Sequence, residues 1–229
     1  MKRFQTFSIL GVAVIVLGSI LLATGCGDDA KARVRVVQAS PDAPNMDVLL
    51  DSKTILSNAA YETASPYTAT TAGQHTIKFN STGTQTTLVT EQGVFAGKSD
   101  TTILAVDKLA NITGLVLTDD NTPPTSGNVK IRVIHASPSS GNVDVYVTAP
   151  GGALTSPALT NVAFKSASSY LSVAAGSYEI RVTPTGNPNV VLIDSGTVNL
   201  TAGQIRTVVA LDADNTGTTF TSIILSDLN

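Results

Sequence analysis

The sequence predicts an all-β protein: two tandem antiparallel β-sandwich domains that follow an N-terminal signal segment. Three observations predict this fold class. The chain is rich in Thr, Val and Gly, lacks Trp and has only 14% charged residues, a composition that favours strands and turns over helices. Apolar and polar residues alternate along short segments. Finally, the first half of the chain recurs in the second half.

The first element is an export signal at residues 1–25. Lys2 and Arg3 precede an uncharged, mostly apolar segment at residues 9–23. As a helix this segment would span roughly 22 Å, which is less than the ~30 Å hydrocarbon core of a bilayer. Its length is typical of the apolar region of a signal peptide, about 7–15 residues. A permanent transmembrane anchor is the alternative, and the residues that follow argue against it.

The segment Leu22-Ala-Thr-Gly-Cys26 resembles a bacterial lipobox, although Ala23 stands where that motif more often has Leu. The resemblance implies a diacylglyceryl thioether on Cys26, cleavage before it and acylation of the new N-terminus. Several acyl chains give stable anchoring where one would be marginal. We therefore expect a lipidated Cys26 and a polar tether at residues 26–31. Gly27, rather than Asp, follows the cysteine, which favours the outer membrane or cell surface.

The charge balance restricts the partners. Without Lys2 and Arg3, 12 basic residues remain against 17 acidic ones, a net charge of −5. No basic stripe is present to neutralise phosphates, so no nucleic-acid partner is expected. The expected partners are the membrane, through the lipid on Cys26, and an envelope protein or a glycan. Cys26 is the only cysteine, so neither an intramolecular disulfide nor a cysteine-based metal site is expected.

An internal repeat sets the domain organisation. Residues 33–41 (RVRVVQASP) match residues 130–138 (KIRVIHASP), and the offset of 97 changes to 103 in a second matching block. The second copy therefore carries six extra residues, around Pro150-Gly151-Gly152. A period near 100 residues is the size of a whole domain. We predict repeat 1 at residues 32–118, a linker at 119–128 in which Pro123-Pro124 forms an extended spacer, and repeat 2 at 129–229.

Each copy shows roughly seven or eight short strands. Residues 142–147 (NVDVYV) alternate cleanly, with the valines on one face. Ala-Gly turns at residues 72–73, 96–97, 175–176 and 202–203 each precede a strand-like run, because Gly adopts backbone angles that other residues adopt only at a cost. Turn signals every 8–12 residues are typical of a β-sandwich of about 100 residues.

Three segments of the second copy are similar to the bacterial domain of unknown function 4397: IRVIHASP up to Pro138, NVDVYV up to Val147, and YLSVAAGSYEIRV from Tyr170. The resemblance covers both copies, although the first has Gln38 in place of His135 and Leu49 in place of Tyr146. It implies immunoglobulin-like sandwiches in secreted or lipid-anchored envelope proteins, often in tandem. It implies no established activity.

The Ser-Pro segments are the main candidate site. The residues of this motif are Ser40, Pro41, Asp47, Ser137, Pro138 and Asp144. A nucleophile–base–acid reading of His135, Ser137 and Asp144 requires a base that the first copy replaces by Gln38. We expect a structural turn instead, in which Ser or Asp side chains bind backbone amides.

Arg35 and Asp47 recur as Arg132 and Asp144, which leaves two structural alternatives. If the first two strands of each copy form a hairpin, each pair shares a face and forms an ion pair worth ~0.2–1 kcal/mol. Otherwise the aspartates cap turn amides.

No metal or cofactor is expected. Residues 212–217 (DADNTG) begin like a calcium loop, but Ile223 occupies the position that requires a bidentate Glu, so a hairpin turn is expected. His75 has no acidic partner nearby in sequence, and two histidines with a lipidated Cys26 do not complete a zinc site.

The aromatic residues admit two interpretations. They are expected to pack in the core and at its edges, or to form platforms that stack on sugar rings: Tyr61, Tyr67, Phe164, Tyr170 and Tyr178. The sequence therefore predicts a lipid-anchored, non-catalytic structural or interaction module of the envelope. A carbohydrate-binding or adhesion accessory protein is the alternative, and a hydrolytic enzyme is the least favoured.

Overall fold

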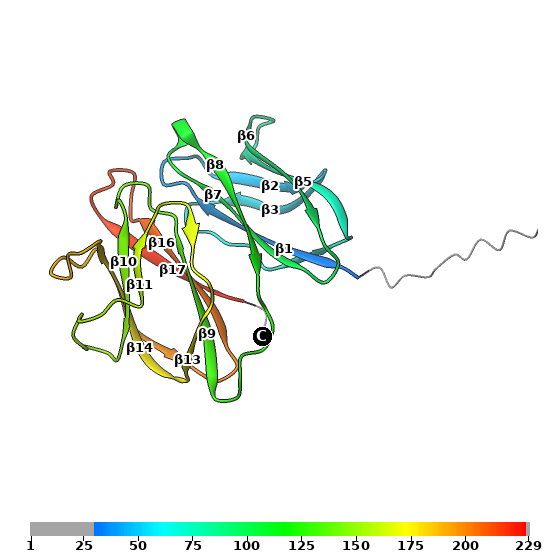
Figure 1. Cartoon of the computed structure of the whole chain (residues 1–229). Coiled ribbons are helices and arrows are strands. Elements are labelled where there is room, and N and C mark those ends of the chain that lie inside the picture. The colour runs from blue at the N-terminus through cyan, green and yellow to red at the C-terminus, as the bar shows by residue number, and fades with distance from the viewer. Residues whose placement is uncertain (1–29, 228–229) are drawn as a thin grey trace, which may run out of the picture.

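The computed structural model describes residues 30–227, and most of these residues form β-strands (Figure 1). The predicted all-β fold class is confirmed. In the first copy the strands are β1 (Ala32–Ala39), β2 (Met46–Leu50), β3 (Lys53–Ala59), β4 (Thr68–Thr70), β5 (Gly73–Ser81), β6 (Thr87–Phe95), β7 (Asp100–Val106) and β8 (Thr113–Asp119). In the second copy they are β9 (Asn128–His135), β10 (Val143–Thr148), β11 (Leu159–Val162), β12 (Ser166–Ala167), β13 (Leu171–Ala174), β14 (Gly176–Pro184), β15 (Ile193–Leu200), β16 (Ile205–Asp212) and β17 (Phe220–Ser226).

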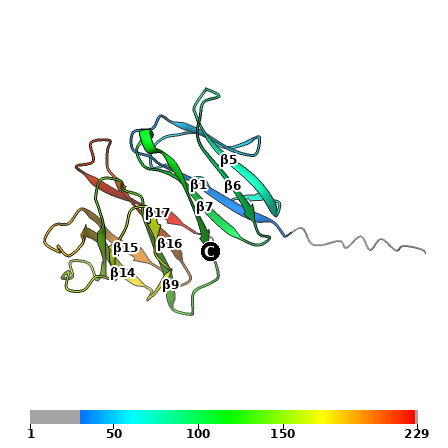
Figure 2. The same cartoon turned by 45° about the horizontal axis from the view of Figure 1, so that its top comes forward.

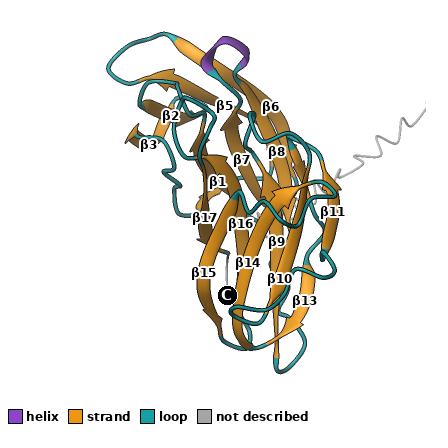
Figure 3. Cartoon of the chain, turned by 90° about the vertical axis from the view of Figure 1, so that its left-hand side faces the viewer, coloured by secondary structure: helices purple, strands orange, loops and turns teal. Residues whose placement is uncertain are grey.

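One 3-10 turn, η1 (Leu109–Asn111), is the only helical element among the described residues, and it lies at one tip of the molecule (Figure 3). Between residues 30 and 227, no helix is long and apolar enough to cross a bilayer.

Each copy is a sandwich of two sheets. Domain 1 packs the sheet β4-β1-β7-β8 on β3-β2-β5-β6, and domain 2 packs β12-β9-β16-β17, with β13 also on β9, against β11-β10-β14-β15. The predicted antiparallel pairing needs one correction, because β1 pairs with β7, and β9 with β16, in parallel. This is possible because β2 to β6 come between β1 and β7 in the chain, and β10 to β15 between β9 and β16, so no tight hairpin forces an antiparallel register.

Each sandwich has a core of its own. In domain 1, alternate residues of the inward faces, such as Met46, Phe79 and Ile103, are buried completely or almost so. In domain 2 the corresponding core includes Ile131 and Val145. The period-2 alternation seen in the sequence therefore marks the inner face of each sheet.

The two domains also pack directly against each other. A third buried apolar cluster joins Val37, Ala39, Leu104 and Val106 of domain 1 to Ile134, Ala136, Val209, Leu211 and Leu225 of domain 2. Figures 1 and 2 show the sheet of β1, β7 and β8 beside that of β9, β16 and β17. The predicted spacer is therefore wrong: the segment around Pro123-Pro124 joins domains that are in contact. The strands leave only residues 120–127 between β8 and β9.

The six extra residues of the second copy lie in a surface loop. Residues 149–158 connect β10 to β11, whereas residues 51–52 suffice for the matched connection between β2 and β3. The loop is eight residues longer rather than six because the matched strands differ in length: β11 begins three positions later than β3, and β10 ends one position later than β2. A surface loop accommodates such an insertion at little cost, because closure entropy grows only logarithmically with loop length.

Candidate functional site

The Ser-Pro turns carry the chain from one sheet to the other. Ser40 and Ser137 are fully buried, and Pro41 and Pro138 are partly buried. In domain 1, the N–H of Ser40 donates to Gln38 Oε1 (2.7 Å), while Gln38 Nε2 donates to the Ser40 carbonyl (3.3 Å). The turn is thus held by a side chain that precedes it by two residues.

His135 holds the matched turn in domain 2 in the same way. The Ser137 N–H donates to His135 Nδ1 (3.3 Å), and His135 Nε2 lies 2.8 Å from the Gly141 carbonyl. Nδ1 must accept, so the ring proton lies on Nε2. In these turns Gln38 and neutral His135 each use one acceptor atom and one donor atom, which explains why Gln38 can replace His135 in the first copy.

The nucleophile–base–acid arrangement is not formed. The Ser137 hydroxyl donates to the buried carboxylate of Asp212 rather than to His135. Burial lowers the pKa of His135, the hydrogen bond to the Gly141 carbonyl opposing this shift, so the ring is held neutral. Asp144 lies in a different turn, described next.

Asp47 and Asp144 cap equivalent turns at the other end of the crossover. Asp144 accepts from the backbone N–H of Asn161 (2.8 Å) and of Gly186 (2.9 Å). Asp47 accepts from the N–H groups of Asn58 (2.8 Å) and Gly83 (3.1 Å), and these bonds lower the pKa of Asp47. Both Asn58 and Asn161 have a left-handed backbone, with φ of 51° and 52°, as such turns require.

The hairpin ion pair between Arg35 and Asp47, and its copy between Arg132 and Asp144, is wrong. β1 and β2 belong to different sheets, so the arginines and these aspartates do not face each other. Arg35 Nη2 instead lies 2.7 Å from Asp227 Oδ1, and Arg132 Nη2 lies 2.6 Å from Asp119 Oδ1.

Both ion pairs cross the boundary between the domains, and they are reciprocal. The arginine comes from the first strand of one domain and the aspartate from the end of the last strand of the other. The arginine side chains are 3% exposed and the aspartate side chains 0%. Charges that are buried this completely must be paired. Each domain therefore supplies the carboxylate that pairs with the buried arginine of the other domain.

The rest of the network repeats as well. Arg35 donates to Thr102 Oγ1 (2.9 Å from Nη2), and Arg132 to Thr207 Oγ1 (3.2 Å). Thr102 then donates to Asp119 Oδ2 (2.6 Å), and Thr207 to Asp227 Oδ2 (2.8 Å). The two halves therefore form one continuous network with approximate two-fold symmetry across the boundary.

Two of the candidate aromatic residues belong to this network. The guanidinium carbons of Arg35 and Arg132 lie 4.6 and 4.9 Å from the ring centres of Tyr67 and Tyr170. The Tyr67 hydroxyl donates to Asp119 (2.6 Å), and the Tyr170 hydroxyl to Asp227 (3.2 Å). Burial, the largest cause, raises the pKa of both tyrosines.

Further contacts close one end of the boundary. The Tyr61 hydroxyl donates to the Asp212 carbonyl (2.6 Å), and Lys165 Nζ lies 2.7 Å from Asp107 Oδ2. Of the remaining aromatic candidates, Phe164 packs edge-on to His135, and the Tyr178 hydroxyl donates to Ala174.

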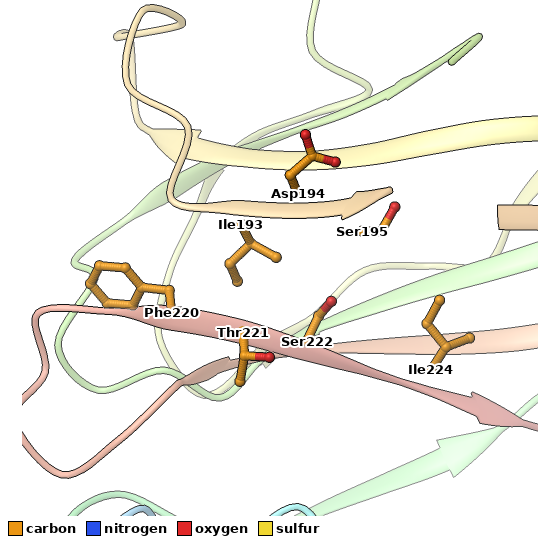
Figure 4. Close-up of a pocket in the computed structure, with 7 residues that line it drawn as sticks. All are labelled: Ile193, Asp194, Ser195, Phe220, Thr221, Ser222 and Ile224. Atoms are coloured by element: carbon orange, nitrogen blue, oxygen red, sulfur yellow. The ribbon is translucent and has the colours of Figure 1, made fainter. Parts of the chain in front are cut away.

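Three cavities accompany this architecture. One of about 520 Å³ is lined by Tyr170, Lys130 and the linker prolines, and one of about 330 Å³ by Tyr67, Arg35 and the end of β17. A third, of about 180 Å³, lies between the edge strands β15 and β17 (Figure 4).

Sequence reasoning missed the partner of His75. Its Nδ1 lies 2.8 Å from Asp51 Oδ2, and its ring stacks on Phe95 with centres 5.5 Å apart. The bond to Asp51 raises the pKa of His75, and burial opposes this shift. The two residues are 24 positions apart and meet only because β2 and β5 are neighbours, so no local signal could have revealed the pair.

The calcium-like segment is a hairpin turn between β16 and β17, in which Asp214 accepts from the N–H and hydroxyl of Thr216. Within residues 30–227, no group of three or more acidic, His or Cys side chains is placed to hold a metal ion. Cys26 lies outside the described residues.

These features define a class of protein: a tandem β-sandwich protein whose recurring polar residues hold turns and a domain boundary together. The chain belongs to the family described as "Domain of unknown function (DUF4397)", which it matches over residues 32–146 and 147–229. The boundary between the two matches falls within β10, whereas the strands divide the domains at residues 120–127.

No curated protein matches the chain. Solved structures that resemble it include the C-terminal domain of AlgF from P. aeruginosa, at 11% identity and a TM-score of 0.30, covering 44% of this chain and 98% of that one. A streptococcal virulence factor described as binding alpha-glucan is 10% identical, with a TM-score of 0.25 and coverage of 78% and 92%. A leucine-rich repeat protein from Bacteroides thetaiotaomicron is 13% identical, with a TM-score of 0.21 and coverage of 78% and 25%. At these TM-scores the likeness carries no argument.

Proposed function

We propose that the protein is a lipid-anchored, non-catalytic module of the bacterial cell envelope that displays two β-sandwich domains as one rigid body. The reciprocal boundary between the domains carries this proposal. A buried apolar cluster and two buried ion pairs couple the sandwiches, and a flexible pair of domains would need neither.

The use of the recurring polar residues supports a non-catalytic role. His135 and Ser137 satisfy buried backbone and carboxylate groups, and Asp47 and Asp144 bind turn amides. Arg35 and Arg132 form ion pairs across the domain boundary. Residues with these tasks stabilise a scaffold, whose outer surfaces are then left for an envelope protein or glycan partner.

Carbohydrate binding is the alternative, and it has weaker support. The aromatic residues that suggested it, Tyr67 and Tyr170, are each covered on one face by a guanidinium and bound through the hydroxyl to a carboxylate. Sugar-binding platforms need exposed ring faces, and these rings are already engaged within the protein.

The lipid anchor is tested by metabolic labelling with a fatty-acid probe. Wild-type chain expressed in a bacterial host should incorporate the probe and fractionate with membranes. Cys26→Ser should lose essentially all of the label, because it removes the only thiol that can carry the thioether. Equal labelling of both chains would refute the anchor.

A further inference from the structure

In the described part of the chain, the outer edge of β17 (Phe220–Ser226) is open from Phe220 to Ile224. β17 is the last strand in the order β12-β9-β16-β17. The Asp227 N–H donates to the Ile205 carbonyl (3.1 Å) and the Ala213 N–H to the Thr219 carbonyl (2.8 Å), so the odd-numbered residues of this strand direct their peptide groups to β16. The even-numbered ones direct theirs outward. The Ser226 carbonyl accepts from Arg35 Nη1 (3.2 Å), which leaves three residues with outward peptide groups that have no partner in the described structure: Phe220, Ser222 and Ile224.

The matched edge of domain 1 is closed by a side chain. Gly114 on β8 corresponds to Ser222, since Ala105 and Ala210 of the neighbouring strands are their respective pairing partners. The Gly114 N–H donates to Glu91 Oε1 (3.2 Å), and the Glu91 side chain occupies the space above Gly114. In domain 2 the same place holds the cavity of about 180 Å³ between β15 and β17.

The open edge lacks the features that normally prevent strand pairing. β17 reads FTSIILS, with no charged residue and no proline, and its register with β16 is unbroken. Edge strands are usually protected by Lys, Pro or a bulge. Ile224 is 38% exposed, and Figure 4 shows Phe220, Ser222 and Ile224 on the side of β17 that faces β15.

The sequence of this edge fits a second copy of itself. In an antiparallel pair centred on Ser222, Phe220 of each copy lies opposite Ile224 of the other, and all three outward peptide groups gain backbone partners. Aromatic and β-branched residues paired across strands stabilise a sheet by ~0.2–1 kcal/mol per pair. We propose that two copies of the chain associate through β17, antiparallel about a two-fold axis at Ser222.

Cysteine cross-linking tests this interface in the intact, membrane-associated protein. Ser222 would form a hydrogen-bonded pair with its counterpart, with Cα atoms about 5.5 Å apart, within the ~4.4–6.8 Å that a disulfide spans. After mild oxidation, Ser222→Cys should give a disulfide-linked dimer on a non-reducing gel. The wild-type chain reports any cross-linking through Cys26, and Val116→Cys, at the β8 position that matches Ile224, reports random collision.

A second substitution in the Ser222→Cys chain separates pairing from collision. Ile224→Lys would place an ammonium opposite Phe220 and should reduce the dimer at least tenfold. Val116→Lys, the matched change on domain 1, should leave it unchanged. The interface is refuted if Ser222→Cys links no better than Val116→Cys, if Ile224→Lys has no effect, or if the thiol links to a different protein instead.

Discussion

At the scale of single residues, recurrence marks polar groups that satisfy the backbone. Gln38 is always neutral, whereas His135 is a titratable side chain. Yet each accepts a hydrogen bond from the backbone N–H of the residue two positions later, and each donates one to a backbone carbonyl. The substitution between the copies preserves one donor and one acceptor. A catalytic base would not tolerate that exchange, because an amide does not take up a proton near neutral pH.

The pKa values of the two histidines should be shifted in opposite directions. The bond to Asp51 raises the pKa of His75, whereas burial lowers that of His135. With only two histidines in the chain, NMR titration of the ring C–H signals resolves both, and one midpoint should lie above about 6.5 and the other below it. Two midpoints on the same side of that value would contradict these environments.

The sign of the effect on stability follows from the same shifts. The contribution of His75 is fully present below about pH 6.5 and is lost as the pH rises through its raised folded pKa. His135 has the opposite effect. Stability falls as the pH drops below about 6.5, because His135 then becomes protonated in the unfolded chain while it remains neutral in the folded chain. His75→Asn should therefore remove the loss on the alkaline side and keep the loss on the acidic side, as measured by urea unfolding between pH 5 and about pH 9.

At the scale of elements, the loop at residues 149–158 shows what an insertion costs. Closing ten residues instead of two costs about 1.4 kcal/mol more by chain entropy. Against this, Glu179 accepts from the Gly151 N–H (2.5 Å) and Arg181 donates to the Gly152 carbonyl. Partly exposed hydrogen bonds of this kind contribute about 0.5–1.5 kcal/mol each.

Because these terms nearly cancel, replacing residues 149–158 by the two-residue connection Asp-Ser of the first copy should change the free energy of unfolding by less than about 1 kcal/mol. Chemical denaturation of the shortened and parent chains measures the difference. A loss of several kcal/mol would mean that the loop has a structural role beyond joining β10 to β11.

At the scale of the whole molecule, the boundary between the domains should make them unfold cooperatively, in a single transition. Removing one partner of a buried ion pair costs about 3–5 kcal/mol, since the other charge remains buried and unpaired. Asp227→Ala should therefore destabilise the chain by about this amount. It should also split the single transition into two, as seen by calorimetry.

The reciprocal pair provides the matched control. Asp119→Ala removes the equivalent carboxylate and should cost a similar amount, whereas adding Arg35→Met to Asp227→Ala should recover much of the loss by removing the stranded charge. Unchanged stability in both single variants would show that the domains are held together by the apolar cluster alone.

Much of the fold could be predicted from local patterns. The alternation along β10 and the turn glycines such as Gly73 fix strands and turns, because side-chain direction and backbone angle are local properties. The place of the six extra residues also followed from the repeat. The structural role of Asp47 and Asp144 was one of two alternatives, and parity within the sequence could not choose between them.

The sequence by itself determined that this protein consists of two all-β domains of one family, with turns at set positions, since periodicity and repetition are written along the chain. Only the tertiary structure decided that β1 joins β7 rather than β2, that Arg35 binds Asp227, and that the sandwiches share a buried boundary. Those partners lie up to 192 residues apart, counted from Arg35 to Asp227. These residues meet only because whole sheets pack together, and their spacing along the chain does not indicate which residues will pair.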